Sequence, residues 1–380
     1  MKIVFTGGGT GGHFYPIIAV AQKVNQIIDR ENILGAKLYF ISDNPYDKQV
    51  LFENGILYEE VTAGKLRTYF SLQSLFKNFT DVFKMFFGTL NAIFKMFSIY
   101  PDVVFGKGGY GSFPAIFAAR ILRIPVVIHE SDSAPGRVNR WAGHFAKKVA
   151  VSFEDAARFF PSEITAWTGQ PIRTEIENPA PQKEAFQYFK FESNVPVILI
   201  LGGSQGAELI NNTIIDALPR LIKNYQIIHQ TGVRNFKVVA GQAAVSITLS
   251  KDRLRYVAFP FLNPLAMKMA AGVATIVVSR AGSTLFEIAS WGVPSILVPF
   301  SESNADHSKK NAFNYARSGA CSVVEEMNMT ANILSSEIER IVGDKTSWQR
   351  MAQSAKAFHK PDAALKVAHQ LVDIALSHEK

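Results

Sequence analysis

The chain has 380 residues, of which 48% are hydrophobic and 19% charged, so it is expected to bury a large core and to form two domains. Its single cysteine, Cys321, excludes an intrachain disulfide and a cysteine-rich metal site and fits a reducing cytoplasm. A formal net charge of +8 favours anionic partners, which include nucleic acid, anionic lipid and phosphorylated metabolites, without choosing among them.

Short apolar runs alternate with amphipathic stretches through the first half of the chain. The predicted strands are residues 2–6, 37–42, 56–62, 102–105, 125–129 and 148–151. Strands that alternate with helical patterns are typical of βα units on a parallel sheet. Because the first strand begins at Lys2, without a basic start and an apolar run before it, no signal peptide is expected.

A glycine-rich turn, Gly7 to His13, follows the first strand and precedes an apolar helical pattern. Glycines allow positive φ and close backbone approach, so such a turn can hold a phosphate or a polar substrate group at a helix N-terminus. It is not a P-loop, because no Gly-Lys-Ser/Thr closes it. A dinucleotide-binding turn is also disfavoured, because no acidic residue ends the second strand cleanly.

Apolar residues between Leu72 and Phe97 follow helical spacing, with Lys77, Lys84 and Lys95 on the opposite side. The spacing predicts a long helix that packs its apolar stripe on the sheet and turns a basic face to solvent. Alternatively, residues at the margins of the stripe face outward and contact an anionic bilayer. These marginal residues are Phe79, Phe83, Met85, Met96 and Lys84. No uncharged apolar stretch reaches the roughly 18 residues of a spanning helix, so membrane contact is expected to be peripheral.

Two further glycine loops follow predicted strands, one at residues 106–112 and one at residues 202–207. Both come at the carboxyl ends of strands, where parallel α/β sheets bind their ligands. A single loop of this kind is equally explained by the need for small residues in a tight βα turn. The three loops together indicate a ligand site.

The strand pattern restarts in the second half, at residues 195–201, and continues with 226–229, 275–279, 295–299 and 320–324. A Pro-rich segment between the two series suits a domain connector, so a second α/β domain is predicted. Within it, residues 279–287 run from a strand through small residues into a helix. Ser283 and Thr284 are expected to cap this helix while its amides face an anionic diphosphate.

Glu287 comes one turn into that helix, where a carboxylate can accept hydrogen bonds from both ribose hydroxyls. A glutamate in a first helical turn is also favourable without any ligand. The polar segment 301–312 then enters the next helix, and it either contacts sugar hydroxyls or is a surface loop.

Six segments carry a family resemblance: GGGTGGHFYP (7–16), GKGGYGSFPA (106–115), HESDSAPGRVNR (129–140), TGQPIR (168–173), GGSQGA (202–207) and SRAGSTLFEIASWGVPSILVPF (279–300). In order and spacing the chain resembles the MurG family, N-acetylglucosaminyltransferases that convert lipid I to lipid II in peptidoglycan synthesis. The resemblance implies the α/β GT-B fold, two Rossmann-like doubly wound domains separated by a cleft. Residues 1–169 would form the domain that faces the acceptor and the membrane, with helices in 348–380 packing back on it, and residues 170–347 the UDP-GlcNAc-binding domain.

The resemblance further implies an inverting hexosyltransferase that moves GlcNAc from UDP-GlcNAc to the muramyl 4-hydroxyl of lipid I. Such an enzyme is peripheral on the cytoplasmic face of the cell membrane, with UDP-GlcNAc, lipid I and the anionic membrane surface as partners and cell-wall synthesis proteins as candidates. No nucleic acid, metal or cofactor is expected. The alternatives are a non-catalytic membrane-bound sugar-nucleotide binding subunit, another lipid glycosyltransferase and a UDP-GlcNAc 2-epimerase.

The substrate-binding residues carried over from the family are Thr10, Gly11, Gly12, Asp132, Arg173, Ser204, Leu262, Ser283, Thr284, Glu287 and Ser308. By this resemblance, the glycine-turn residues lie near the diphosphate and the acceptor, and Arg173 and Ser204 contact the diphosphate. Leu262 would contact the uracil, and Ser283, Thr284 and Glu287 the diphosphate and ribose. The chain departs from the family at Asp132, usually Asn, and at Ser308, usually Gln. Because Ser308 is too short for that Gln's reach to the sugar, His307 or Asn311 is expected to compensate.

His13, Glu130 and Asp132 are the candidates for the catalytic base. We favour His13, because the positive end of a helix disfavours imidazolium and keeps a neutral base near pH 7. Each candidate also has a structural alternative. His13 would then make a hydrogen bond that holds the glycine turn, and the two carboxylates would cap a helix or pack the turn before Pro135. Helix N-termini and Arg173 are expected to stabilise the charge that develops on the leaving diphosphate.

Overall fold

A computed structural model describes residues 1–64, 72–203, 207–247, 249–301 and 306–377 of the chain. It divides into two compact units, Met1–Arg173 with Pro361–Lys380, and Thr174–Lys360. Residues 348–360, predicted from the sequence to lie with the first domain, therefore belong to the second unit, and only the last helix returns to the first. The acceptor-facing and donor-binding roles of the two units stay predictions.

The first unit is built on a parallel sheet whose described strands have the order β3-β2-β1-β4-β5-β6-β7. They are β1 (Lys2–Thr6), β2 (Lys37–Ser42), β3 (Ile56–Glu60), β4 (Val103–Gly106), β5 (Val126–Glu130), β6 (Lys148–Val151) and β7 (Thr165–Trp167). In the central strand β1, Ile3, Val4 and Phe5 are all buried, as expected for a sheet that helices cover on both faces. The strand order reverses between β1 and β4, which is where sheets of this type bind ligands.

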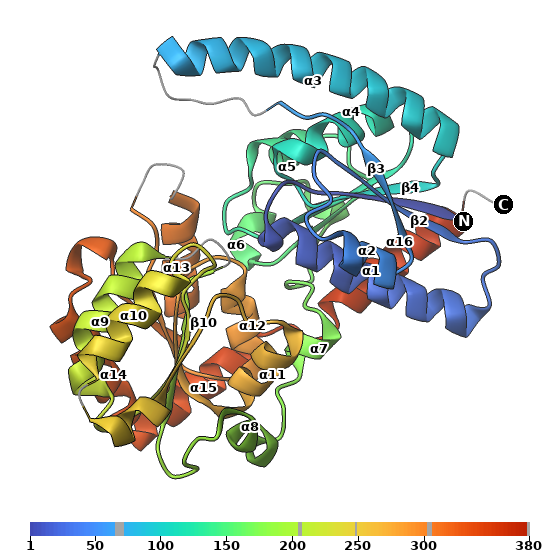
Figure 1. Cartoon of the computed structure of the whole chain (residues 1–380). Helices are drawn as coiled ribbons and strands as arrows, with labels where there is room; N and C mark the ends of the chain where they lie inside the picture. The colour runs from blue at the N-terminus through green and yellow to red at the C-terminus, as the bar shows by residue number, and fades with distance from the viewer. Residues whose placement is uncertain (65–71, 204–206, 248, 302–305, 378–380) are drawn as a thin grey trace. The chain divides into compact units, whose positions relative to one another are not determined.

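Two layers of helices cover this sheet (Figure 1). The helices are α1 (Gly11–Glu31), α2 (Lys48–Glu53), α3 (Leu72–Ile99), α4 (Phe113–Ile121), α5 (Arg137–Ala142), α6 (Glu154–Ala157) and α16 (Ala363–Leu376). α1 and α16 pack against each other on one face, while α3 and α4 pack together on the other. From α16, Val367 and Leu371 enter the same buried core as Ile17 and Val24 of α1.

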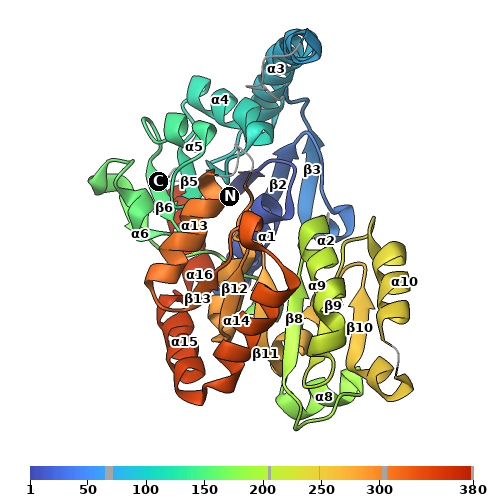
Figure 2. The same cartoon turned by 90° about the vertical axis from the view of Figure 1, so that its left-hand side faces the viewer.

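The second unit repeats the same topology, with described strands in the order β10-β9-β8-β11-β12-β13. The strands are β8 (Val197–Leu201), β9 (Gln226–Gln230), β10 (Tyr256–Phe259), β11 (Ala274–Ser279), β12 (Ser295–Leu297) and β13 (Cys321–Val323). The helices are α7 (Thr174–Glu177), α8 (Gln182–Phe189), α9 (Glu208–Leu221), α10 (Phe236–Ser246), α11 (Pro264–Val273), α12 (Thr284–Trp291), α13 (Asp306–Arg317), α14 (Ala331–Gly343) and α15 (Lys345–Phe358). α9, α10 and α14 lie along one face of the sheet (Figure 2).

Helix α3 is oriented opposite to the prediction in its described part. Gly88, Ala92 and Met96 are buried, and a Cβ on Gly88 would collide with the Thr62 carbonyl oxygen, so the helix backbone approaches the segment after β3 directly. Small residues therefore face inward. The larger apolar residues are left outside, with exposed fractions from 38% to 72%, at Val82, Phe83, Phe86, Phe87, Leu90, Phe94 and Phe97.

The prediction that this stripe packs on the sheet is therefore wrong, and Met96, expected at an exposed margin, is buried. Phe83 and Lys84 are exposed and Met85 is half-buried, whereas the side chain of Phe79 lies outside the described residues. By length and composition alone, Asp81–Ile99 would suffice to cross a membrane, although only a peripheral contact is expected from the sequence. That criterion is weak, because core helices of soluble proteins meet it as well.

Candidate active site

At the strand-order reversal of the first unit, two glycine loops touch. The Gly8 N–H donates to the Gly108 carbonyl at 3.1 Å, and a Cβ on Gly109 would lie 3.2 Å from the Gly8 Cα. Gly108 and Gly109 have φ angles of 84° and 80°, which side-chain-bearing residues rarely adopt. The loops after β1 and β4 therefore form one continuous backbone surface, which needs glycine for both conformation and space.

His13 lies in the first turn of α1, beside these loops, and is half-buried. Its Nδ1 is 2.9 Å from the hydroxyl of Thr10, the residue that precedes Gly11 and Gly12 at the helix start. Burial lowers the pKa of His13 to about 4; the charge of Lys107 also lowers it, whereas Asp132 opposes the change. The imidazole is therefore neutral near pH 7 and able to accept a proton.

Glu130 ends β5 and uses its carboxylate to hold the turn that follows. It accepts hydrogen bonds from the backbone N–H of Asp132 (2.9 Å) and Gly136 (3.1 Å) and from the Asn139 side-chain amide (2.9 Å). Burial and the charge of Asp132 raise the pKa of Glu130, while the hydrogen bonds from Asp132 and Asn139 and the charge of Lys107 oppose the rise. This geometry suits Glu130 to orienting the turn rather than to accepting a proton.

Lys107, which had no predicted role, lies buried directly beneath the two glycine loops, with an exposed fraction of 1%. Its ammonium group donates to His129 Nδ1 at 2.8 Å and to the Ser131 hydroxyl. The signal in the sequence is a charged residue at the end of a buried strand, enclosed by glycines in Gly106-Lys107-Gly108.

In the second unit, the residues predicted to meet the donor gather at the carboxyl ends of β11 and β12. Ser283, Thr284 and Glu287 are half-buried at the start of α12. Ser283 holds the N-cap position in a helical conformation and its side chain makes no capping hydrogen bond, so the predicted capping role of Ser283 is wrong. Instead the N–H of Leu285 donates to the carbonyl of Gly282 at 3.2 Å, which tightens the helix start.

The other predicted donor contacts lie on several elements. Leu262 is buried, and its N–H donates to Gln230 Oε1 at 3.0 Å, which fixes the backbone after β10. The Ser308 hydroxyl accepts from the Phe300 N–H at 3.3 Å, so this short side chain is turned toward the backbone. Arg173 belongs to the first unit, where its guanidinium lies 3.9 Å from the centre of the Tyr15 ring. Ser204 lies outside the described residues.

An ion pair that the sequence did not reveal supports the loop after β12. Arg280 Nη1 lies 2.6 Å from Glu326 Oε1, and the guanidinium stacks on Phe300 at 4.1 Å. The other Glu326 oxygen accepts from the Ser301 N–H at 2.9 Å. Arg280 thus fixes the backbone that leads toward Ser308.

Comparison with known protein families gives two matches that together span most of the chain. The glycosyltransferase family 28 N-terminal domain matches residues 3–151, and the family's C-terminal domain matches residues 197–367. The chain belongs to glycosyltransferase family 28. The predicted glycosyltransferase activity class and GT-B fold are confirmed.

Full-length relatives support this membership. A Bacillus anthracis protein named UDP-N-acetylglucosamine–N-acetylmuramyl-(pentapeptide) pyrophosphoryl-undecaprenol N-acetylglucosamine transferase 2 is 32% identical, over 97% of this chain and 99% of the relative. A Clostridium kluyveri transferase of the same name, without the final number, is 34% identical, over 93% of this chain and 95% of the relative. Among solved structures, MurG of Acinetobacter baumannii aligns with a TM-score of 0.72 and 26% identity, over 98% of this chain and 99% of that chain.

The family 28 chain also aligns with a UDP-GlcNAc 2-epimerase from Neisseria meningitidis, with a TM-score of 0.65 and 16% identity, over 98% of this chain and 100% of that chain. At this identity the likeness shows the fold alone. Because the fold is shared, family membership rather than fold separates this chain from an epimerase.

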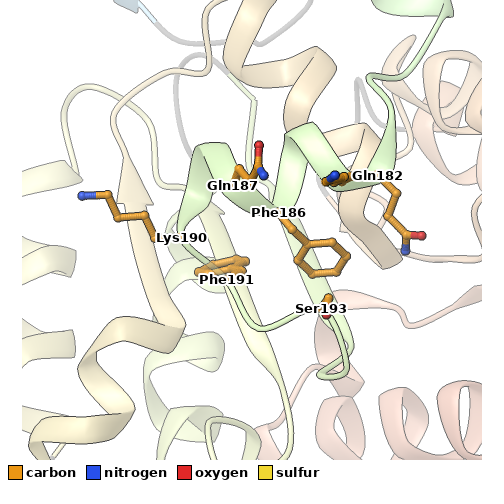
Figure 3. Close-up of a pocket in the computed structure, with 7 residues that line it drawn as sticks. Gln182, Phe186, Gln187, Lys190, Phe191 and Ser193 are labelled. Carbon is orange, nitrogen blue, oxygen red and sulfur yellow. The ribbon is translucent and has the colours of Figure 1, made fainter.

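A pocket of about 590 Å³ lies elsewhere on the second unit of this family 28 chain. It is lined by residues of α8 and the segment after it: Gln182, Lys183, Phe186, Gln187, Lys190, Phe191 and Ser193 (Figure 3). These residues precede β8, at the amino ends of the strands. Because parallel α/β sheets bind substrates at the carboxyl ends, this pocket is not part of the candidate active site.

Proposed function

We propose that this family 28 enzyme transfers GlcNAc from UDP-GlcNAc to the muramyl 4-hydroxyl of lipid I, with inversion at the anomeric carbon, and so forms lipid II. The observation that carries the proposal is the end-to-end match to relatives named for this reaction, at 32% identity over 97% of the chain. The match includes both units, so the segments expected to serve donor and acceptor are both present.

In the proposed reaction the muramyl hydroxyl attacks the anomeric carbon, a new carbon–oxygen bond forms, and the bond to the UDP oxygen breaks. His13 receives the hydroxyl proton. For Nε2 to serve as base, Nδ1 must carry the hydrogen and donate it to the Thr10 hydroxyl. The low pKa of His13, about 4, keeps this nitrogen unprotonated at physiological pH.

The donor side of the proposal assigns the diphosphate to the start of α12, where Ser283 and Thr284 lie, and the ribose to Glu287. Amides at a helix N-terminus stabilise anionic groups, and a carboxylate one turn further accepts from the ribose hydroxyls. Leu262 would meet the uracil, and Arg173 and Ser204 the diphosphate. Ser308 is assigned no direct sugar contact, because its hydroxyl is turned to the Phe300 backbone.

The exposed apolar side of α3 is the part of the first unit proposed to rest on the membrane. Phe83, Phe94 and Phe97 are 50%, 72% and 69% exposed. Lys84 of the same helix is exposed, and so are Arg120 and Arg123, on α4, which packs against α3, and just after it. Apolar residues flanked by cations suit a peripheral position on the anionic cytoplasmic leaflet, where a lipid-linked acceptor resides.

The decisive experiment is transfer of radiolabelled GlcNAc from UDP-GlcNAc to a lipid I analogue. We expect a labelled disaccharide-lipid product that forms only when the analogue is present. Formation of UDP-ManNAc without an acceptor would instead identify an epimerase. Donor binding without product would identify a non-catalytic sugar-nucleotide binding subunit.

A further inference from the structure

Beneath the contact of the two glycine loops lies a buried cationic network centred on Lys107. Its ammonium donates to His129 Nδ1 at 2.8 Å and to the Ser131 hydroxyl. His129 Nε2 lies 3.0 Å from the Gly169 carbonyl, which only accepts, so Nε2 carries the hydrogen and Nδ1 the lone pair. Lys107 is therefore the donor to a neutral histidine.

The network continues through hydroxyl and amide groups to neighbouring strands. Ser131 donates to Gln170 Oε1 at 2.8 Å, and Ser152 donates to the same oxygen at 2.7 Å. Asn139 donates to the His129 carbonyl at 3.1 Å as well as to Glu130. One ammonium group thus connects the ends of β4, β5 and β6 with the segment that follows β7.

Lys107 is also adjacent to the proposed base. A Cβ on Gly7 would lie 3.4 Å from the Lys107 Cβ and 3.6 Å from the His13 Cβ, so the two side chains leave the backbone on either side of this glycine. The charged or titratable groups that surround the cluster are His13 on α1, Asp43 after β2, His129 and Glu130 on β5, and Asp132 after it.

The charges of this cluster act in opposite directions. Burial lowers the pKa of Lys107 to about 8, whereas the carboxylates of Glu130 and Asp132 favour its ammonium form. Its positive charge lowers the pKa of His13, and Asp132 raises it. Removing the cation therefore favours protonation of His13, and removing Asp132 disfavours it.

We propose that Lys107 is a positioning residue for transfer: its ammonium holds the Ser131–Asp132 turn beside the glycine loops and places a positive charge next to the His13 imidazole. This inference rests on the proposed function of His13 as base. A purely structural side chain at this buried position would not need a charge, because an apolar chain of similar length fills the space without the cost of dehydration.

The test compares Lys107→Met, Lys107→Gln and Lys107→Arg with Lys147→Met, a change at an exposed lysine of the same unit. The His13 signal of protein labelled with ¹³C-histidine is assigned by its loss in His13→Ala and titrated by NMR. The pH profile of kcat/KM for a lipid I analogue is measured in parallel. The affinity for UDP-GlcNAc reports whether each variant keeps its second unit intact.

We expect both neutral variants to raise the pKa of His13 from about 4 by about one pH unit or more, and the acid limb of kcat/KM to move by the same amount. Lys107→Arg and Lys147→Met should leave the limb in place. A fall in activity without movement of the limb and of the His13 titration would overturn the inference. So would failure of both neutral variants to fold while Lys147→Met folds, since Lys107 would then be a core residue only.

The NMR titration needs no turnover, so it separates the two proposals. If the wild-type protein transfers no GlcNAc but the His13 titration responds to Lys107, the proposed function fails and the electrostatic link stands. If the wild type transfers GlcNAc and the titration is unaffected, the function stands and the role of Lys107 fails.

Discussion

Replacing Phe94 and Phe97 on α3 with serine is expected to weaken binding to anionic vesicles by roughly 30- to 700-fold. The two side chains are 72% and 69% exposed, so each has most of its surface available to a bilayer. Full burial of a phenylalanine is worth about 1.5–3 kcal/mol, and at these exposures each contributes about 1–2 kcal/mol. Together they give about 2–4 kcal/mol, and about 1.4 kcal/mol corresponds to a factor of ten.

The assay is co-sedimentation with vesicles that contain phosphatidylglycerol, at low and at high salt. Phe52→Ser is the matched control, because Phe52 is 84% exposed on α2, which lies with α1 rather than with α3 (Figure 1). Salt should weaken the contribution of Lys84, Arg120 and Arg123 but not the effect of the serine changes. Unchanged vesicle binding of the double variant, or an equal loss in Phe52→Ser, would refute a membrane role for this side of α3.

His13→Ala is expected to lower kcat for transfer by about 100-fold or more with little change in donor affinity, and near-wild-type turnover at saturating acceptor would contradict its role as base. Glu287→Ala should weaken UDP-GlcNAc binding by very roughly ten- to a hundredfold through the loss of charge-assisted hydrogen bonds, and unchanged affinity by calorimetry would remove Glu287 from the site. Burial lowers the pKa of His229 from 6.5 to about 3, so below pH 6.5 the unfolded chain binds a proton that the folded chain does not. Stability should therefore fall with acid by roughly 1.4 kcal/mol per pH unit from this group; urea midpoints at pH 7 and pH 5 should differ less in His229→Gln, and an equal acid loss would refute the assignment. Leu371→Ala should destabilise the first unit by about 2–5 kcal/mol, because Leu371 is fully buried in its core, and an unchanged urea midpoint would contradict this packing.

Most of the strands could be predicted because the central ones are short apolar runs buried on both faces, and such runs are distinctive in a sequence. The two that were missed are β7, Thr165–Trp167, and β10, Tyr256–Phe259. Both are short strands at an edge of their sheet. Unlike the edge strands β3 and β13, which were predicted, β7 and β10 contain no buried residue, so their composition carries less of the signal.

Which side of α3 faces the rest of the first unit was not predictable from periodicity alone. Helical spacing identifies an apolar side, but it does not say whether that side meets the protein or another apolar phase. The informative residues were small ones: Gly64 and Gly88 both lie where a Cβ would collide with backbone of the facing segment. Close backbone approach therefore decided which side of α3 faces inward, and the phenylalanines were left outside.

The candidate site was predictable where its chemistry is local. The glycine loops, His13 and the start of α12 are visible in the sequence because each follows a strand directly. The roles of Lys107, Gln170 and Arg280 depend on partners that are distant along the chain, such as Ser131 for Lys107 and Glu326 for Arg280. Only the folded structure brings these groups together.

The return of α16 to the first unit has a consequence for how the protein is made. The core of the first sheet includes Val367, Leu371 and Val372, which are synthesised after the whole second unit. During translation the apolar side of α1 emerges early, whereas its partner α16 emerges only after the second unit. The first unit is thus completed after the second. A nascent chain stalled near residue 360 would expose apolar core residues of the first unit, which chaperones can bind.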